Sequence, residues 1–160
     1  MVSPLLTSIA YQPLGLPMTH RFGVVFFRYG LIPNPLDIRF QSVSGIGSTI
    51  RKEDDPTSSN SVVRKVMPTG IEHKELVLKR GLVLGSFLSY DFQNTMNTFK
   101  FTRSDVMVTI FSEIGVPSGA WMFTEAIPVG WELDDLNAQG ESVLIETMTL
   151  AYTNVRHVGL

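Results

Sequence analysis

The segment Asp105–Ala126, with the sequence DVMVTIFSEIGVPSGAWMFTEA, decides the fold of this 160-residue chain. Its first part, Asp105–Phe111, combines β-branched, apolar and aromatic side chains, which is the composition of a strand. Glycine and proline in Gly115–Gly119 supply turn chemistry, and a second strand is expected over Trp121–Ala126. Because Pro128 lacks a backbone N–H, this strand is expected to end, to bend or to lie at a sheet edge there.

On both sides of this segment, other short stretches also have the composition of strands. Strands are expected at His20–Arg28, Leu36–Ser44, Ser61–Met67, Ile71–Arg80 and Ser142–Tyr152, with turns at Gly30–Pro35 and Pro68–Gly70 and a loop at Asp134–Gly140. The stretch Leu36–Ser44 alternates with period two, as a half-buried strand does. Its apolar side chains should face the core, and the polar set should face away: Asp37, Arg39 and Gln41.

One helix is expected near the middle of the chain. Leu84, Leu88, Phe92 and Met96 recur every four residues, and Ser86 is a suitable N-cap. Many short strands with a single helix indicate a mainly β protein. The sequence therefore predicts an antiparallel β-sandwich or barrel with one flanking α-helix.

The most polar stretch is Gly45–Asn60, which is expected to be a long, mobile loop at the tip of a hairpin. It holds a cluster of charges of both signs: Arg51, Lys52, Glu53, Asp54 and Asp55. Around it we expect a proline-containing extended arm over residues 1–19, a β-domain over 20–155 and a tail over 156–160.

Composition and motifs argue against an enzyme. The chain has no cysteine and a net charge of -2, which exclude thiol chemistry and weaken a role in nucleic-acid binding. The histidines His20, His73 and His157 are too dispersed for a recognised metal motif. No catalytic residue, cofactor or metal is therefore expected. The start of the chain lacks a signal-peptide pattern and no apolar run could cross a membrane, so synthesis and assembly in the cytoplasm are expected.

Three stretches, taken together, resemble the tail tube protein family of contractile phages and phage-tail-like injection particles, to which the type VI secretion tube protein is related. They are Pro35–Gly45 (PLDIRFQSVSG), Pro68–Gly81 (PTGIEHKELVLKRG) and Trp121–Tyr152 (WMFTEAIPVGWELDDLNAQGESVLIETMTLAY). The resemblance implies a structural protein whose hexameric rings stack into a hollow tube, which sheath contraction drives through a target envelope.

The resemblance also implies partners and roles for particular residues. The partners would be further copies of the chain, contractile sheath proteins, spike hub and baseplate proteins, and cargo in the lumen. The charged residues 51–55 would contact the adjacent ring, and Asp37, Arg39 and Gln41 would line the lumen if their strand belongs to the inner sheet. Three alternatives stay open: a specialised ring that starts the tube on the spike hub, a monomeric ligand-binding barrel, and an enzyme.

Overall fold

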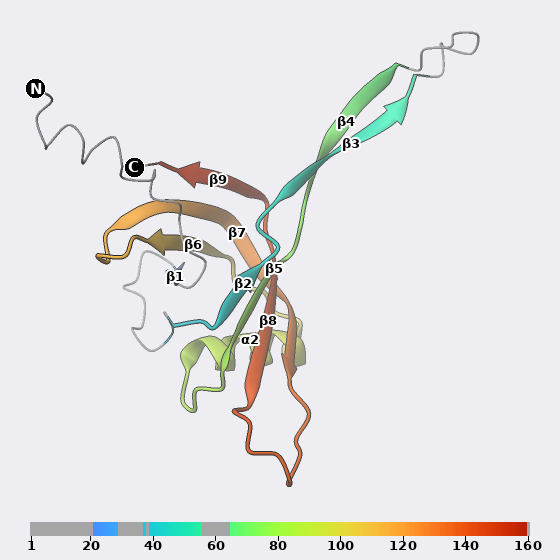
Figure 1. Ribbon diagram of the computed structural model, residues 1–160. Helices are drawn as coiled ribbons and strands as arrows, with labels where there is room; N and C mark the ends of the chain where they lie inside the picture. The colour runs from blue at the N-terminus through green and yellow to red at the C-terminus, as the bar shows by residue number, and fades with distance from the viewer. Residues whose placement is uncertain (1–20, 29–36, 38, 56–64, 160) are drawn as a thin grey trace, which may run out of the picture.

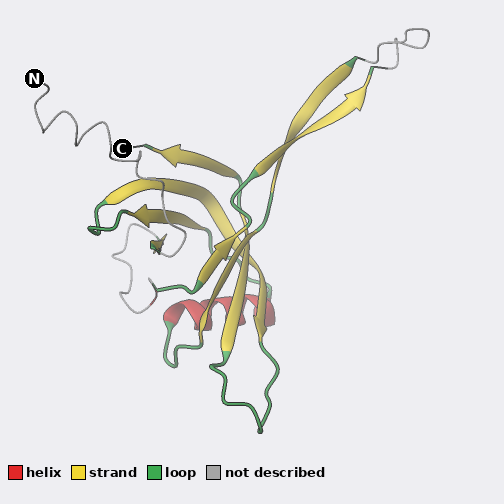
Figure 2. Ribbon diagram, viewed as in Figure 1, coloured by secondary structure: helices red, strands yellow, loops and turns green. Residues whose placement is uncertain are grey.

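The computed structural model describes residues 21–28, 37, 39–55 and 65–159. The expected N-terminal arm, the turn Gly30–Pro35, the positions of Leu36 and Ile38, and the start of the strand expected at Ser61 lie outside these residues. Within them the chain is mainly β, with antiparallel strands and one helix, as the sequence predicts (Figures 1 and 2).

The body is one antiparallel sheet in the order β1-β6-β7-β8-β5-β2, with β9 pairing along β7. Its strands are β1 (Phe22–Phe27), β2 (Ser42–Ser44), β5 (Leu76–Gly81), β6 (Ser104–Phe111), β7 (Pro117–Leu133), β8 (Ile145–Ala151) and β9 (Asn154–Val158). A second, two-stranded sheet of β3 (Ser48–Asp54) and β4 (Val66–His73) projects away from the body (Figure 1).

The long strand β7 divides the body sheet into two halves. Its first part pairs with β6 and β9, and its second part, from Ile127, pairs with β8. Between the two parts Glu125 has a φ of 53°, and the β6–β7 register shifts beside it. We call β1, β6, β9 and the first part of β7 the β1 half, and β2, β5, β8 and the second part of β7 the β2 half.

Both halves of the sheet direct regular rows of side chains toward one shared core. In the β1 half, one row across the strands is Phe26, Val106, Phe123 and Val155. In the β2 half, the corresponding row is Val43, Leu78, Met148 and Trp131. Members of both rows belong to the same buried cluster or pack against it, so the two halves enclose a sandwich-like core.

Pro128 bends β7 rather than ending it. The residue is buried, and the β7–β8 register shifts between Pro128 and Gly130. The bulge leaves Val129 out of the ladder, while Pro128 stays opposite Leu150. A proline without an N–H is tolerated there because this part of β7 pairs on one side only. Of the three outcomes expected for this position, two are observed: the strand bends at the bulge, and among the described residues this part of β7 pairs with β8 alone and so lies at a sheet edge.

The helix α2 (Phe87–Thr98) begins where the sequence predicts. Ser86 has an extended backbone, and its side chain accepts a hydrogen bond from the Ser89 N–H, as an N-cap does. The predicted apolar stripe is only partly correct, because Leu84 precedes the helix and is 88% exposed. The helix instead buries Ser89, Phe92 and Thr95.

Replacing Phe92 by alanine should lower the free energy of unfolding by about 3–5 kcal/mol, the usual cost of emptying a buried Phe site. Phe92 is 1% exposed and belongs to the central cluster. Urea unfolding followed by circular dichroism would measure the change. Tyr90→Ala is a matched control on the same helix because Tyr90 is 69% exposed. A loss below about 1 kcal/mol for Phe92→Ala would contradict the assignment.

Two sequence expectations around the arm are wrong. Ser48–Asp54 is a strand rather than part of a loop, and β4 runs straight through the expected turn Pro68–Gly70. The register shifts between Arg51 and Lys52, opposite this segment, so Pro68 lies at a bulge. After β8 the chain forms a further strand, β9, which continues to Val158.

Candidate assembly surface

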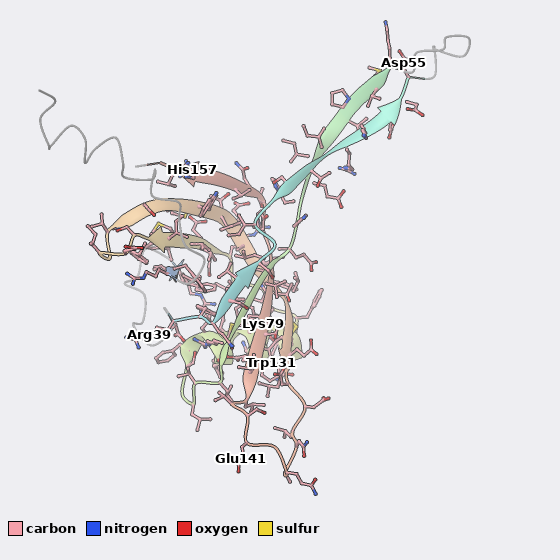
Figure 3. All side chains as sticks on the ribbon, viewed as in Figure 1. Arg39, Asp55, Lys79, Trp131, Glu141 and His157 are labelled. Atoms are coloured by element: carbon pink, nitrogen blue, oxygen red, sulfur yellow. The ribbon has the colours of Figure 1, made fainter. Side chains whose placement is uncertain are left out.

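The arm formed by β3 and β4 is exposed along almost its whole length. Every residue of β3 is exposed, and β4 has only two partly buried positions. In Figure 3 side chains extend from both faces of the arm, and Asp55 lies at its outer end. A two-stranded ribbon with no covering layer is at best marginally stable alone in water, so this arm is a candidate contact surface.

The register of β3 and β4 gives the arm two chemically different faces. One face pairs Ile50 with Ile71, and these side chains are 62% and 63% exposed. Farther out, the same face carries Pro68 and Val66 opposite Lys52 and Asp54. Strand alternation places the remaining charges on the other face: Arg51, Glu53 and Glu72.

The structure therefore places Arg51, Lys52, Glu53 and Asp54 on β3 and Asp55 directly after it. They share one arm, but alternation divides them between its two faces. The apolar face was missed from the sequence because its members are scattered among charged residues. The signal that could have found it is the pair of isoleucines at Ile50 and Ile71, which face each other in the ladder.

The arm is fixed where it leaves the body. Gly45 has a φ of 84°, and a Cβ at this position would lie 1.8 Å from the Glu75 carbonyl oxygen, so only glycine fits there. The Ser48 Oγ and the His73 Nδ1 are 2.7 Å apart, within hydrogen-bonding distance. The His73 ring also packs on Tyr152, with centroids 5.3 Å apart. These contacts set the direction in which the arm projects.

Tyr152 joins the base of the arm to the core through its ring alone. The ring also contacts Phe123, with centroids 4.8 Å apart, whereas the buried hydroxyl has no hydrogen-bond partner among the described groups. Burial raises the pKa of Tyr152 above its usual value of 10.0.

Tyr152→Phe should raise the free energy of unfolding by about 1 kcal/mol at neutral pH, because it removes a buried, unsatisfied hydroxyl. The advantage should grow as the pH rises through 10. There the unfolded wild type can lose the Tyr152 proton, while the folded protein holds it more tightly, so Tyr152 costs the wild type stability that the phenylalanine variant keeps. Urea unfolding at pH 7.5 and at pH 10.5 would measure both effects. A less stable phenylalanine variant would show that the hydroxyl has a favourable partner.

A buried polar cluster fixes the helix to the β2 half. Arg80 is 2% exposed and Glu146 is 0% exposed, and they pair directly across β5 and β8. The Arg80 Nε donates to the Glu146 Oε2 at 3.2 Å, and Nη1 donates to the Asp37 Oδ1 at 2.9 Å. The Arg80 Nη2 donates to the hydroxyl oxygens of Ser86 and Ser89. The Trp131 Nε1 donates to the Glu146 Oε1 at 2.6 Å.

The prediction that Asp37 faces away from the core is wrong, because Asp37 belongs to this buried cluster. This residue is 8% exposed and does not face away from the core, because its carboxylate receives the Arg80 guanidinium and the Ser86 hydroxyl. The strand expected over 36–44 shortens accordingly to Ser42–Ser44. Arg39 and Gln41 are exposed, as expected, on the segment that leads to β2.

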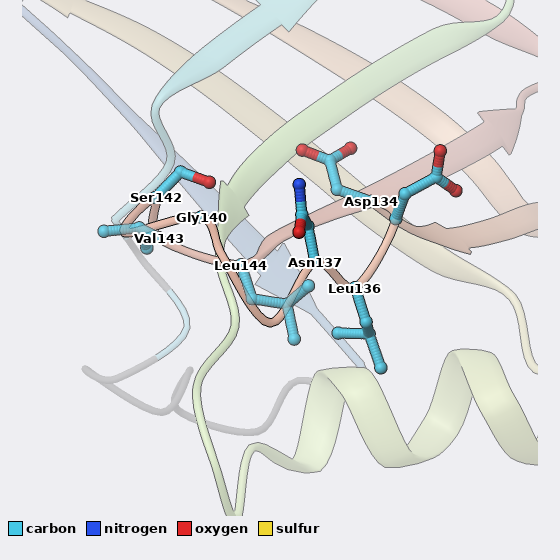
Figure 4. A pocket seen from close by; sticks show the side chains of 8 residues that line it. Asp134, Leu136, Asn137, Gly140, Ser142, Val143 and Leu144 are labelled. Atoms are coloured by element: carbon cyan, nitrogen blue, oxygen red, sulfur yellow. The ribbon is translucent and has the colours of Figure 1, made fainter.

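Two shallow hollows lie elsewhere on the described surface. One of about 410 Å³ is made entirely by the β7–β8 connection (Figure 4), and its lining residues are Asp134, Asp135, Leu136, Asn137, Gly140, Ser142, Val143 and Leu144. The other, of about 210 Å³, lies between the C-terminal end of α2 and β7 and is lined by Met96, Phe99, Phe101 and Val129 among others. The described residues include no group of acidic, histidine or cysteine side chains able to hold a metal ion. No helix among them is long and apolar enough to cross a membrane.

Comparison with known proteins identifies the class. The family model for the T4-like virus tail tube protein gp19 matches residues 18–156, so the chain belongs to this tail tube family. The comparison with curated proteins gave no match.

Among solved structures, the fold is similar to a chain in the cryo-EM structure of the anti-feeding prophage baseplate. The TM-score is 0.81 with 31% identity, covering 90% of this chain and 96% of that one. A chain of the extended sheath–tube complex of the extracellular contractile injection system PVC aligns over 100% of both chains, with 18% identity and a TM-score of 0.76. Hcp1 from Flavobacterium johnsoniae aligns over 87% of this chain and 95% of its own, with 18% identity and a TM-score of 0.55. The predicted family and fold are confirmed.

Proposed function

We propose that this chain is a structural subunit of the inner tube of a contractile injection system, and that it assembles into hexameric rings. The observation that carries the proposal is the match to the tail tube family over residues 18–156. The exposed arm supports it, because an uncovered ribbon with two isoleucines at more than 60% exposure gains stability when a neighbouring subunit covers it. In this proposal the charges of residues 51–55 set the register of that contact.

Within the tube, we propose that the chain forms the ring that joins the inner tube to the spike hub. Identity is 31% with the anti-feeding prophage baseplate chain, compared with 18% with the PVC sheath–tube chain. The first is a chain of the anti-feeding prophage baseplate, whose cryo-EM structure is six-fold symmetrised. The repeating tube subunit is the second candidate, supported by the alignment over the full length of both chains in the sheath–tube complex.

The function proposed is mechanical and requires neither a cofactor nor catalysis. The partners would be identical copies within the ring, the tube ring above, the spike hub and baseplate proteins below, and the contractile sheath outside. Assembly in the cytoplasm as part of a phage-tail-like particle, and cargo in the lumen, complete the proposal.

Electron microscopy of the purified protein, alone and together with its spike hub protein, would test the proposed ring. Rings are expected by negative stain, with a matching mass in analytical ultracentrifugation. Gold labelling of an epitope tag after Leu160 in whole particles would then locate the chain. A single label at the baseplate end is expected, whereas label along the particle would support the repeating subunit. Monomer alone in both preparations would refute the ring.

A further inference from the structure

We infer that the connection between β7 and β8, residues 134–144, docks into the hollow at the C-terminal end of α2 of the next copy in the ring. This inference rests on the proposed ring. It assigns to the ring a contact between two surface features that the fold of a single subunit does not use.

The hollow is an apolar surface beside a free positive charge. Its volume is about 210 Å³, and Met96, Phe99, Phe101 and Val129 in its lining are each at least 39% exposed. Lys100, between the two phenylalanines, is exposed and makes no ion pair with another described residue. Pockets for small molecules usually measure about 300–1,000 Å³. A protruding apolar side chain therefore suits this hollow better than a small-molecule ligand does.

Phe99 is held at the edge of the hollow in an unfavourable backbone conformation. It is the C-cap of α2 and has a φ of 56°, a left-handed value that bulky residues rarely adopt. Its N–H donates to the Thr95 carbonyl oxygen at 3.0 Å, and its ring meets the Phe101 ring edge-on with centroids 4.9 Å apart. The residue is nevertheless 82% exposed, so this conformation gains no burial within the subunit. Backbone strain of this kind is concentrated at functional surfaces.

The β7–β8 connection has the chemistry that matches the hollow. Leu136 is 83% exposed. Asp134, Asp135 and Glu141 are also exposed, and the connection contains no basic residue. Figure 4 shows Asp134 and Leu136 on the same limb of the connection. The leucine supplies an apolar side chain for the hollow, and the carboxylates supply charges opposite to that of Lys100.

Other protruding apolar side chains match the hollow less well. Ile114, on the turn between β6 and β7, is 85% exposed, but only one acidic residue, Glu113, adjoins it. The apolar face of the arm carries Lys52 as well as its two isoleucines. Lys52 would bring a like charge toward Lys100, which disfavours that pairing.

The contact joins two copies rather than two parts of one copy. Val129 in the hollow and Leu133 at the end of β7 are four residues apart, which is about 13 Å along a strand. In Figure 1 the connection continues beyond the sheet at the end away from the arm, so Leu136 is farther still from the hollow. A contact between two different surfaces of one chain is heterologous, and such contacts generate rings when the rotation closes.

Paired cysteines would test the contact, since the chain has no cysteine of its own. In Met96→Cys/Leu136→Cys, the two positions of one copy are too far apart for a disulfide, which needs Cα atoms within about 7 Å. Oxidation of assembled rings should therefore link different copies and give a ladder of oligomers on denaturing gels. The matched control is Met96→Cys/Ile114→Cys, whose second cysteine replaces an almost equally exposed side chain. We expect no ladder from the control.

Reversing the charges would give a second, independent measurement. Lys100→Glu and Asp135→Lys should each weaken ring assembly about threefold to fivefold in sedimentation, as expected when an exposed ion pair is lost. The variant that combines both reversals should recover most of the loss, because opposite charges face each other again. Glu113→Lys, on the turn between β6 and β7, is the control and should assemble as the wild type does.

The outcomes separate this contact from the proposed ring itself. The inference would be overturned, with the proposed function intact, if rings formed but the control pair alone gave a ladder, both pairs gave equal ladders, or neither gave one. If a cysteine variant does not assemble, the charge reversals decide, and single reversals without effect or a combined variant without recovery would count equally against the contact. Wild-type protein that forms no rings, alone or with its spike hub protein, would refute both.

Discussion

Replacing Arg80 by methionine is expected to destabilise the folded subunit by about 3–5 kcal/mol, the usual cost of leaving a buried charge without its partner. Arg80 is 2% exposed, and its loss would leave the Glu146 carboxylate, 0% exposed, with only neutral donors. Asp37 would lose its cation as well. Because a domain is typically stable by only 5–15 kcal/mol, most of the protein should then be found in inclusion bodies or unfold at low urea.

Lys79→Met provides a matched control, since it makes the same substitution one residue earlier on the same strand. Lys79 is exposed and points away from the core, so its stability change should stay within about 0.5 kcal/mol. Urea denaturation of both variants, with the ring fraction measured by size exclusion, gives the comparison. Equal stability of the two methionine variants would show that the cluster contributes nothing to the fold.

The strands of the body were predictable because each buries one face. In β8, for instance, Glu146, Met148 and Leu150 are buried and the intervening residues are not. The same alternation contained the signal for the polar cluster. Arg80 and Glu146 occupy core positions of their strands, where a charge needs a partner. The sequence could not show that the partners face each other, because the pairing of β5 with β8 depends on the tertiary fold.

The arm was not predictable by the same reasoning. Every residue of β3 is exposed, so no apolar alternation marks it as a strand, and its charges are typical of a loop. Pro68 and Gly70 are likewise typical of a turn, yet they lie inside β4, opposite a register shift. A free-standing ribbon tolerates proline because one edge of each strand needs no ladder partner. A ribbon without a covering layer needs no buried apolar face within the subunit, so its sequence carries no local pattern that marks it as a strand.

Removing the arm should abolish ring stacking and docking while leaving the subunit folded. In the variant, an Asn-Gly turn replaces residues 49–72 and connects Ser48 directly to His73, which already face each other in the ladder. The excised described residues contribute nothing to the central buried cluster. We therefore expect single rings by negative stain, a thermal unfolding midpoint within a few degrees of the wild type, and no tube or hub complex.

A finer pair of variants separates the apolar face of the arm from its length. Ile50→Thr/Ile71→Thr keeps two β-branched side chains, and hence strand propensity, but removes apolar surface from one face. Thr49→Ser/Glu72→Gln makes similarly small changes at the adjacent pair on the opposite face. We expect the threonine variant to weaken ring-to-ring or ring-to-hub association at least tenfold in sedimentation, which corresponds to about 1.4 kcal/mol. The control should assemble as the wild type does. If the two variants assembled equally well, the isoleucine face would not be the contact, and the charges on the other face would become the surface to test.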